Sequence, residues 1–145
     1  MPSLQSSGGK GLPRSLSRLY DALASGIAAD ELLVDISDAA PTVADVSVYE
    51  SQVRSSGSAG NEILQLPAGS FPGARHLVTF AAEGNASDVV RVNAGAGQAL
   101  RSQGMVGETP AAITNLDLDT VGEYGLFEYD GNGNWNLLYT TGATS

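Results

Sequence analysis

The sequence contains no cysteine and a single histidine, and both facts exclude whole classes of chemistry. Without cysteine the chain has no disulfide framework, no thiolate metal ligand and no cysteine nucleophile. One histidine rules out a zinc site built from histidine and cysteine. A Ser-His-Asp triad would have to use His76, and no G-x-S-x-G segment is present to expose a nucleophilic serine. We therefore expect His76 to be a structural or an exposed residue rather than a catalytic one.

Long apolar runs and basic residues are also scarce. No segment approaches the roughly 18 consecutive apolar residues that a membrane-spanning helix needs, and the first 20 residues lack the apolar centre of a secretory signal. Lys and Arg number 7 against 16 Asp and Glu, which gives a net charge of −9. An acidic protein repels phosphate-rich surfaces, so we expect neither nucleic acid nor a membrane as a partner.

The few basic residues are unevenly distributed along the chain. Lys10, Arg14 and Arg18 are the only charged residues before Asp21, so residues 1–20 carry a net charge of +3. Residues 21–145 contain 4 basic and 16 acidic residues and carry −12. Because residues 1–14 are rich in serine and glycine, we expect them to form a flexible N-terminal arm. A basic arm on an acidic body suits docking on an acidic protein surface, and a solvated tail is the alternative.

Residues 15–45 are expected to hold a short helix followed by a linker. Ser15 is a suitable N-cap after Pro13, and Gly26 favours a kink or the end of the helix. The segment DELLVDISD, residues 30–38, fits either a helical turn or a short strand. The apolar residues at helical spacing, which form a stripe for core packing or for a partner, are Leu16, Leu19, Tyr20, Leu23 and Ile27.

From Val46 to the end, the apolar pattern changes to a period of two, which predicts strands. Short strands separated by Gly, Pro, Asn and Asp at spacings of about ten residues are typical of all-β sandwiches and barrels. We therefore expect a mainly β protein in which residues 46–145 form an antiparallel β-sandwich or jelly-roll-like domain. The expected strands cover residues 46–53, 61–67, 76–82, 88–92, 111–118, 122–129 and 134–140, and residues 93–110 are expected to be a long loop.

Two acidic residues alternate with leucine in NLDLDT, residues 115–120. Asp117 and Asp119 would lie about 7 Å apart on one strand face, and such a pair can serve glycoside hydrolysis or calcium binding. Leu116 and Leu118 face the other way, so a half-buried strand with an acidic outer face is the simpler interpretation.

The glycine-rich segment NAGAGQAL, residues 93–100, does not fit a nucleotide site. It carries Gly95-x-Gly97, but Leu100 stands where a dinucleotide fingerprint needs its third glycine, and no βαβ pattern surrounds it. This mismatch and the scarcity of catalytic residue types lead us to expect that the protein binds no cofactor and no metal ion and is not an enzyme.

The segment DGNGNW, residues 130–135, partly matches a calcium-binding loop. Trp135 replaces the glycine that such a loop requires, and Thr141 stands at its twelfth position in place of a bidentate glutamate. Asp-Gly and Asn-Gly instead favour the turn of a β-hairpin. The alternation of the flanking segments predicts one inward face on each strand, with Phe127 and Tyr129 on the first and Trp135, Leu137 and Tyr139 on the second.

Three sequence features together resemble a module of tailed-bacteriophage structural proteins. They are L-P-A-G at residues 66–69, V-T-F at residues 78–80, and a hairpin close to G-x-x-x-L-x-x-Y-D-G-x-x-W-x-L from Gly122 to Leu137, whose turn is one residue longer here. The similar region covers about residues 61–140.

This resemblance implies a capsid decoration (cement) protein on the exterior of the virion. The implied protein is a homotrimer that binds the lattice of the major capsid protein and stabilises the head. The alternative is a tail or head-fibre module that binds a host glycan through Tyr124, Trp135 and Tyr139. The residues expected to dock on the capsid or on a neighbouring subunit are Lys10, Arg14, Leu16, Arg18, Leu19, Tyr20 and Leu23.

Overall fold

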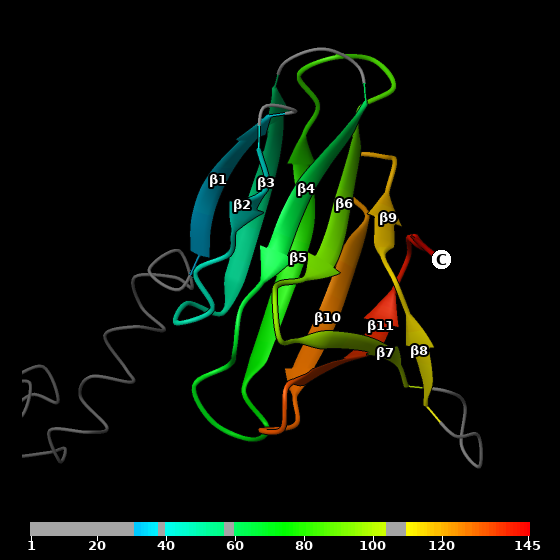
Figure 1. Cartoon of the computed structure of the whole chain (residues 1–145). Helices are drawn as coiled ribbons and strands as arrows, with labels where there is room; N and C mark the ends of the chain where they lie inside the picture. The colour runs from blue at the N-terminus through cyan, green and yellow to red at the C-terminus, as the bar shows by residue number, and fades with distance from the viewer. Residues whose placement is uncertain (1–30, 38–39, 57–59, 104–109) are drawn as a thin grey trace, which may run out of the picture. The chain divides into compact units, whose positions relative to one another are not determined.

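The computed structural model describes residues 31–37, 40–56, 60–103 and 110–145 (Figure 1). The chain divides into a unit of residues 1–31 and a unit of residues 32–145, and the description below concerns the second. The expected arm, residues 1–14, and the expected helix lie outside the described residues. So do all seven predicted docking residues, which are Lys10, Arg14, Leu16, Arg18, Leu19, Tyr20 and Leu23.

The described chain is mainly β and contains no helix. Its strands form two sheets (Figure 1). In spatial order the seven-stranded sheet contains β1 (Glu31–Ser37), β3 (Glu50–Ser56), β5 (Arg75–Ala82), β10 (Tyr124–Tyr129), β11 (Asn134–Thr140), β7 (Ala99–Ser102) and β8 (Ala111–Ile113). The five-stranded sheet contains β12 (Ala143–Thr144), β9 (Leu116–Leu118), β6 (Val89–Ala94), β4 (Asn61–Leu66) and β2 (Thr42–Val43).

Both sheets mix parallel and antiparallel pairs, so the expectation of a purely antiparallel fold is wrong. β3 pairs in parallel with β5, β4 pairs in parallel with β6 and β2, and β11 pairs in parallel with β7. The pairs β5–β10, β10–β11 and β6–β9 are antiparallel. The reason is that the chain changes sheet between successive strands from β3 to β7. After two such crossings the chain is back in the first sheet and runs in its original direction, so the two strands of that sheet can pair in parallel.

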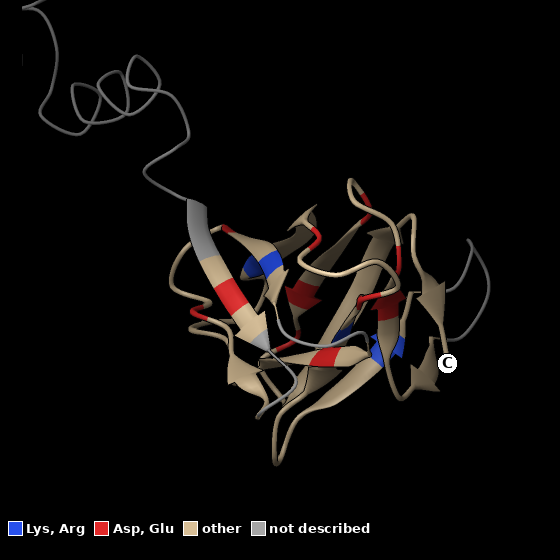
Figure 2. Cartoon of the chain, turned by 90° about the horizontal axis from the view of Figure 1, so that it is seen from above, with Lys and Arg blue, Asp and Glu red and all other residues tan. Residues whose placement is uncertain are grey.

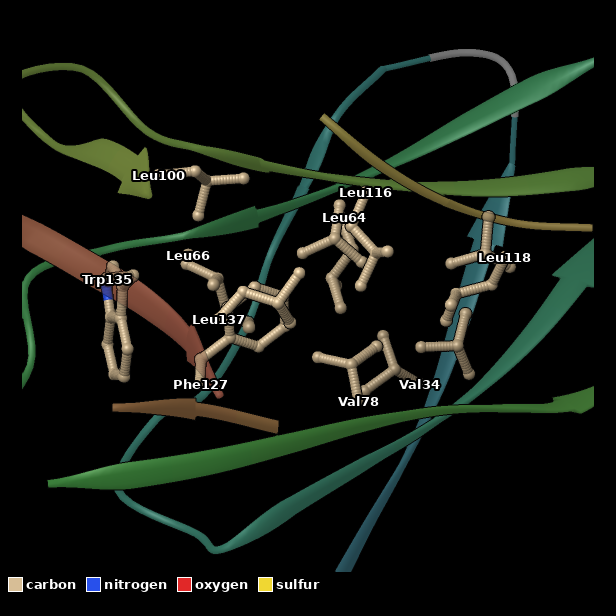
Figure 3. Close-up of a cluster of buried hydrophobic side chains, with 14 of the residues drawn as sticks. Val34, Leu64, Leu66, Val78, Leu100, Leu116, Leu118, Phe127, Trp135 and Leu137 are labelled. Atoms are coloured by element: carbon tan, nitrogen blue, oxygen red, sulfur yellow. The ribbon is translucent and has the colours of Figure 1, made fainter. Parts of the chain in front are cut away.

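One hydrophobic core lies between the inner faces of the two sheets (Figure 3). It forms because each long strand turns every second side chain inward, as the period-two pattern predicts. The five-stranded sheet contributes Leu64, Leu66, Val90, Val92, Leu116 and Leu118, and the seven-stranded sheet contributes Val34, Ile36, Val53, Val78, Phe80, Leu100, Phe127, Trp135 and Leu137. This arrangement is β-sandwich-like.

Several strand boundaries differ from those expected. β3 begins at Glu50, because residues 46–49 form a turn and bend instead of a strand. The segment expected to be one strand over residues 111–118 is divided between the two sheets as β8 and β9. It breaks at Thr114 and Asn115, whose backbone N–H groups donate to the carbonyl oxygen of Ser145. The ambiguous segment 30–38 contains strand β1, and the expected loop 93–110 contains strand β7.

Candidate interaction site

Two of the three sequence features that resemble the phage module, the L-P-A-G turn and the hairpin, form one packed cluster. The indole Nε1–H of Trp135 donates to the carbonyl oxygen of Pro67 at 2.6 Å. The Tyr129 ring lies against Gly69, where an added Cβ would come within 2.5 Å of the Tyr129 Cγ. Tyr129 and Trp135 are themselves in contact, with ring centroids 5.1 Å apart. The L-P-A-G turn and the two flanks of the hairpin therefore fix one another's positions.

The turn of the hairpin is held by the side chain of Asp130. Its Oδ1 accepts hydrogen bonds from the backbone N–H groups of Asn132 and Asn134, and its Oδ2 accepts one from the side-chain amide of Asn134 at 2.6 Å. The side-chain bond from Asn134 and the backbone bond from Asn132 lower the pKa of Asp130. Gly131 and Gly133 supply the left-handed backbone, with φ of 83° and 90°. The predicted hairpin turn is confirmed, and the carboxylate serves the turn itself.

His76 was expected to be either structural or exposed. It is fully buried, and it is a structural residue. Its Nδ1–H donates to the carbonyl oxygen of Val48 at 3.0 Å, because that oxygen can only accept. Its Nε2 then accepts the hydroxyl hydrogen of Ser51 at 2.9 Å. Burial lowers the pKa of His76, while the bond to Val48 opposes this shift. The pair has the donor–acceptor geometry of a catalytic Ser-His dyad, but both side chains are shielded from solvent.

Asp117 and Asp119 do not form the two-carboxylate arrangement of a glycosidase. Asp117 accepts two hydrogen bonds from Arg91, at 2.7 and 2.6 Å, across the β6–β9 pair. Asp119 lies beyond the end of β9, where its Oδ1 accepts from the hydroxyl of Thr120. Leu116 and Leu118 are fully buried, so the predicted half-buried strand is confirmed.

A second buried polar group gave no signal in the sequence. Asp88 is fully buried, and its Oδ2 accepts from the Ser55 hydroxyl at 2.7 Å and from the Asn85 backbone N–H at 2.9 Å. The Ser55 hydroxyl oxygen in turn accepts from the Gly84 N–H at 3.0 Å. These bonds tie the loop after β5 to the end of β3. Within the part of the chain that the structure covers, no group of three or more His, Asp or Glu side chains is arranged to hold a metal ion.

The outer face of the seven-stranded sheet carries a row of apolar side chains. Leu126 on β10 lies directly opposite Leu77 on β5 and opposite Tyr139 on β11. Residues paired in this way share one face of the sheet. Tyr139 is 69 % exposed and Tyr124, two residues before Leu126 and hence on the same face, is 37 % exposed. We call Leu77, Tyr124, Leu126 and Tyr139 the outer apolar row.

Tyr139 was expected on the inward face with Trp135 and Leu137, and this expectation is wrong. The register between β10 and β11 shifts after the Phe127–Leu137 pair, so that Leu138 is an extra residue and Tyr139 lies opposite Leu126. Such a β-bulge reverses the face on which the following side chains lie. Next along β10 is Gly125, where an added Cβ would come within 2.3 Å of the Leu116 Cδ2. The space at Gly125 is thus filled by Leu116, which leaves no room for an inward tyrosine.

The charged residues of the described chain are mostly acidic (Figure 2). Three of its four arginines form ion pairs, namely Arg54 with Asp35, Arg75 with Glu128, and Arg91 with Asp117. Arg101 forms no ion pair within the described ranges, although its charge contributes to the lowered pKa of Asp130. Trp135 is 1 % exposed and is a core residue, so only Tyr124 and Tyr139 of the three expected stacking residues reach the surface.

Comparison with known protein families gives no matching family, and comparison with curated protein sequences gives no significant match. No helix of the described residues is long and apolar enough to cross a membrane.

Proposed function

We propose that this chain is a capsid decoration (cement) protein of a tailed bacteriophage. It binds the lattice of the major capsid protein on the outside of the head, as a trimer, and stabilises the particle. The virion context comes from the resemblance of residues 61–140 to phage structural modules. The support from the structure concerns the role of those residues, which is architectural.

The observation that carries the proposal is the packed cluster around Trp135. Residues from L-P-A-G and from both flanks of the hairpin contact one another through a buried indole hydrogen bond and a tyrosine packed on a glycine. A sequence pattern whose residues maintain such a cluster indicates a shared fold. This matches the expectation for a structural module, which acts through its surface while its packed residues maintain the fold.

The arrangement suits a rigid body attached by a separate segment. The buried polar side chains His76, Ser51, Asp88 and Ser55 all take part in hydrogen bonds within the body. The body is acidic, whereas residues 1–20 are basic. In the proposed mechanism the basic arm and the apolar stripe of residues 16–27 hold the capsid, and three copies on one trimer raise the avidity.

Binding to emptied capsids of the phage that encodes the chain tests this proposal. Purified protein is mixed with capsids that lack it, and the bound fraction is measured by co-sedimentation together with the temperature at which the capsids break apart. We expect saturable binding at a fixed ratio to the major capsid protein and a higher disruption temperature. Absence of binding would show that the protein has another role.

A second candidate function is binding of a host glycan, and the positions of Tyr124 and Tyr139 favour it. The two exposed rings lie on the same face of neighbouring strands, which is a suitable arrangement for stacking on sugar rings. Binding of the isolated protein to host lipopolysaccharide, lost in Tyr139→Ser and retained in Val43→Ser, would support this function over decoration. Val43 is a matched control because it is 60 % exposed and lies on the other sheet.

A further inference from the structure

The outer apolar row crosses the middle of the seven-stranded sheet from β5 to β11. Leu77, Leu126 and Tyr139 lie directly beside one another, and Glu50 on β3 continues the row beyond Leu77. Tyr139 is the most exposed large hydrophobic side chain of the described residues, at 69 %. The bulge places the Tyr139 ring on the outer face next to two leucines. This creates an exposed apolar surface whose hydration is unfavourable.

The charges on this face are arranged with opposite signs on opposite sides. Arg75 and Glu128 neutralise each other at 3.0 Å within the face, and Arg54 pairs with Asp35 near one edge. Glu50 on β3 and Arg101 on β7 are on either side of the apolar row, and within the described ranges neither is in an ion pair. Glu50 accepts a hydrogen bond from the Thr79 hydroxyl at 2.7 Å, which holds its side chain on this face.

We propose that this face binds the same face of a second copy of the chain about a two-fold axis that runs along β10. A two-fold axis in the plane of contact reverses the order of the strands. β5 of one copy therefore meets β11 of the other, and β3 meets β7. Leu77 then packs against Tyr139 of the second copy, and Leu126 packs against its own equivalent.

The same operation brings each Glu50 toward Arg101 of the second copy. Arg101 is level with Glu128, because Asn136 pairs with both, and Glu50 is level with Leu126 through Leu77. The two levels differ by two residues, or about 7 Å along the strands, which the long side chain of an arginine can span. The pairing places the two unbalanced charges of each copy opposite complementary charges. This self-complementarity favours a second copy over an unrelated partner.

The size of the face indicates a weak and reversible contact. Five strands at about 4.8 Å spacing and about 20 Å length give roughly 500 Å² per copy, below the roughly 800 Å² per partner of a standard interface. We therefore expect association that depends on protein concentration. The pairing does not rest on the proposed function. It is also compatible with a trimer, because neighbouring three-fold positions of a closed lattice are related by local two-fold axes.

Sedimentation of the full chain over a range of concentrations tests the pairing. We expect the mass of the species found at low concentration to double as the concentration rises. Tyr139→Ser should weaken this step by at least about tenfold, as loss of a central aromatic contact does, and Val43→Ser should leave it unchanged. Circular dichroism checks that both variants are folded. A mass that stays constant with concentration would overturn the proposal. So would a doubling of mass that persists in Tyr139→Ser, even if that variant loses glycan binding.

A charge exchange tests the orientation of the two copies. Glu50→Arg alone and Arg101→Glu alone should each weaken the association by roughly tenfold, because each places like charges opposite one another. The double variant Glu50→Arg/Arg101→Glu should restore it, since the charges are again complementary. A double variant as weak as the single variants would rule out this orientation.

The absence of native cysteine allows the axis to be located directly. Leu126→Cys places one thiol beside the proposed axis, and a bifunctional maleimide that spans about 10 Å should link two copies. Sheets packed face to face lie about 10 Å apart, which is too far for a direct disulfide. Val43→Cys is the matched control and should remain unlinked under the same conditions. Efficient linking of the control, or none at residue 126 at concentrations where the mass doubles, would contradict a two-fold axis along β10.

Discussion

At the scale of single residues, the buried His76 and Ser51 link the stability of the fold to pH. Burial lowers the pKa of His76 in the folded state, whereas a histidine in the unfolded chain titrates near about 6.5. Between these two values the unfolded state binds more protons. The free energy of unfolding should therefore fall as the pH drops from about 6.5 through the lowered pKa, by at most about 1.4 kcal/mol per pH unit.

Urea unfolding at a series of pH values from 7.5 to 5 measures this slope. His76→Gln keeps a buried donor and acceptor but cannot gain a proton, so its stability should depend less on pH in this window. An equal slope in the wild type and in His76→Gln would assign the pH dependence to other groups. Loss of part of the bonding to Ser51 and Val48 should lower the overall stability of the variant by about 1–3 kcal/mol.

Gly69 is a second residue whose environment makes a specific prediction. An added Cβ would lie 2.5, 2.6 and 2.7 Å from three atoms of the Tyr129 side chain. Tyr129 packs against Trp135 and is 8 % exposed, so it has little room to move. Gly69→Ala should lower the free energy of unfolding by about 1–3 kcal/mol, the usual cost of overpacking. Gly60→Ala, where nothing lies within 4 Å, is the control and should be nearly neutral in the same unfolding measurement.

At the scale of the strands, the sequence predicts what is local and misses what depends on distant partners. The alternation identifies Phe127 and Tyr129 of β10, and Trp135 and Leu137 of β11, correctly as inward residues, because it follows from the pleat of a single strand. β2, β7 and β12 have only two to four residues, too few to show a period. The parallel pairing of β3 with β5 arises from crossings between the sheets, which no local pattern records.

The candidate site shows the same division. The turn residues Asp130, Gly131 and Gly133 predict the hairpin because the required backbone conformation is a property of those residues. The outward position of Tyr139 could not be predicted, since it depends on a bulge in β11 and on Leu116 from the other sheet filling the space at Gly125. Asp88 gave no signal because its partner Ser55, 33 residues earlier in the chain, is brought to it only by the fold.

The β6–β9 pair provides a prediction at this scale. Arg91 donates two hydrogen bonds to Asp117, and the side chains of both residues are less than one third exposed. Asp117→Asn should lower the free energy of unfolding by about 1 kcal/mol, because the bidentate ion pair is lost. Asp119→Asn, outside the strand, should have a smaller effect. If both carboxylates served in hydrolysis, each change would instead abolish an activity and leave stability similar, which assays on oligosaccharides can detect.

At the scale of the whole molecule, the distribution of charge is the feature that relates the body to its proposed partner. The net charge of −12 over residues 21–145 contrasts with +3 over residues 1–20. Most arginines of the described body are already paired with carboxylates. The basic segment before the body therefore supplies most of the positive charge that is available to the proposed partner.

Deletion of residues 1–14 tests this separation of roles. The deletion removes Lys10 and Arg14 and leaves every core residue of the described chain in place, so we expect the thermal unfolding temperature of the body to remain unchanged. Binding to capsids should be lost or strongly reduced, and binding of the intact chain should weaken as salt rises from 50 to 500 mM, since screening acts on exposed charges (Debye length about 10 Å at 0.1 M). The full-length variant Lys10→Gln/Arg14→Gln separates charge from the remaining contacts of the arm. Undiminished capsid binding by the truncated protein would assign docking to the β body. The outer apolar row would then be the first surface to test. Tyr139→Ser suits that test, because it removes the most exposed side chain of the row and changes no core residue.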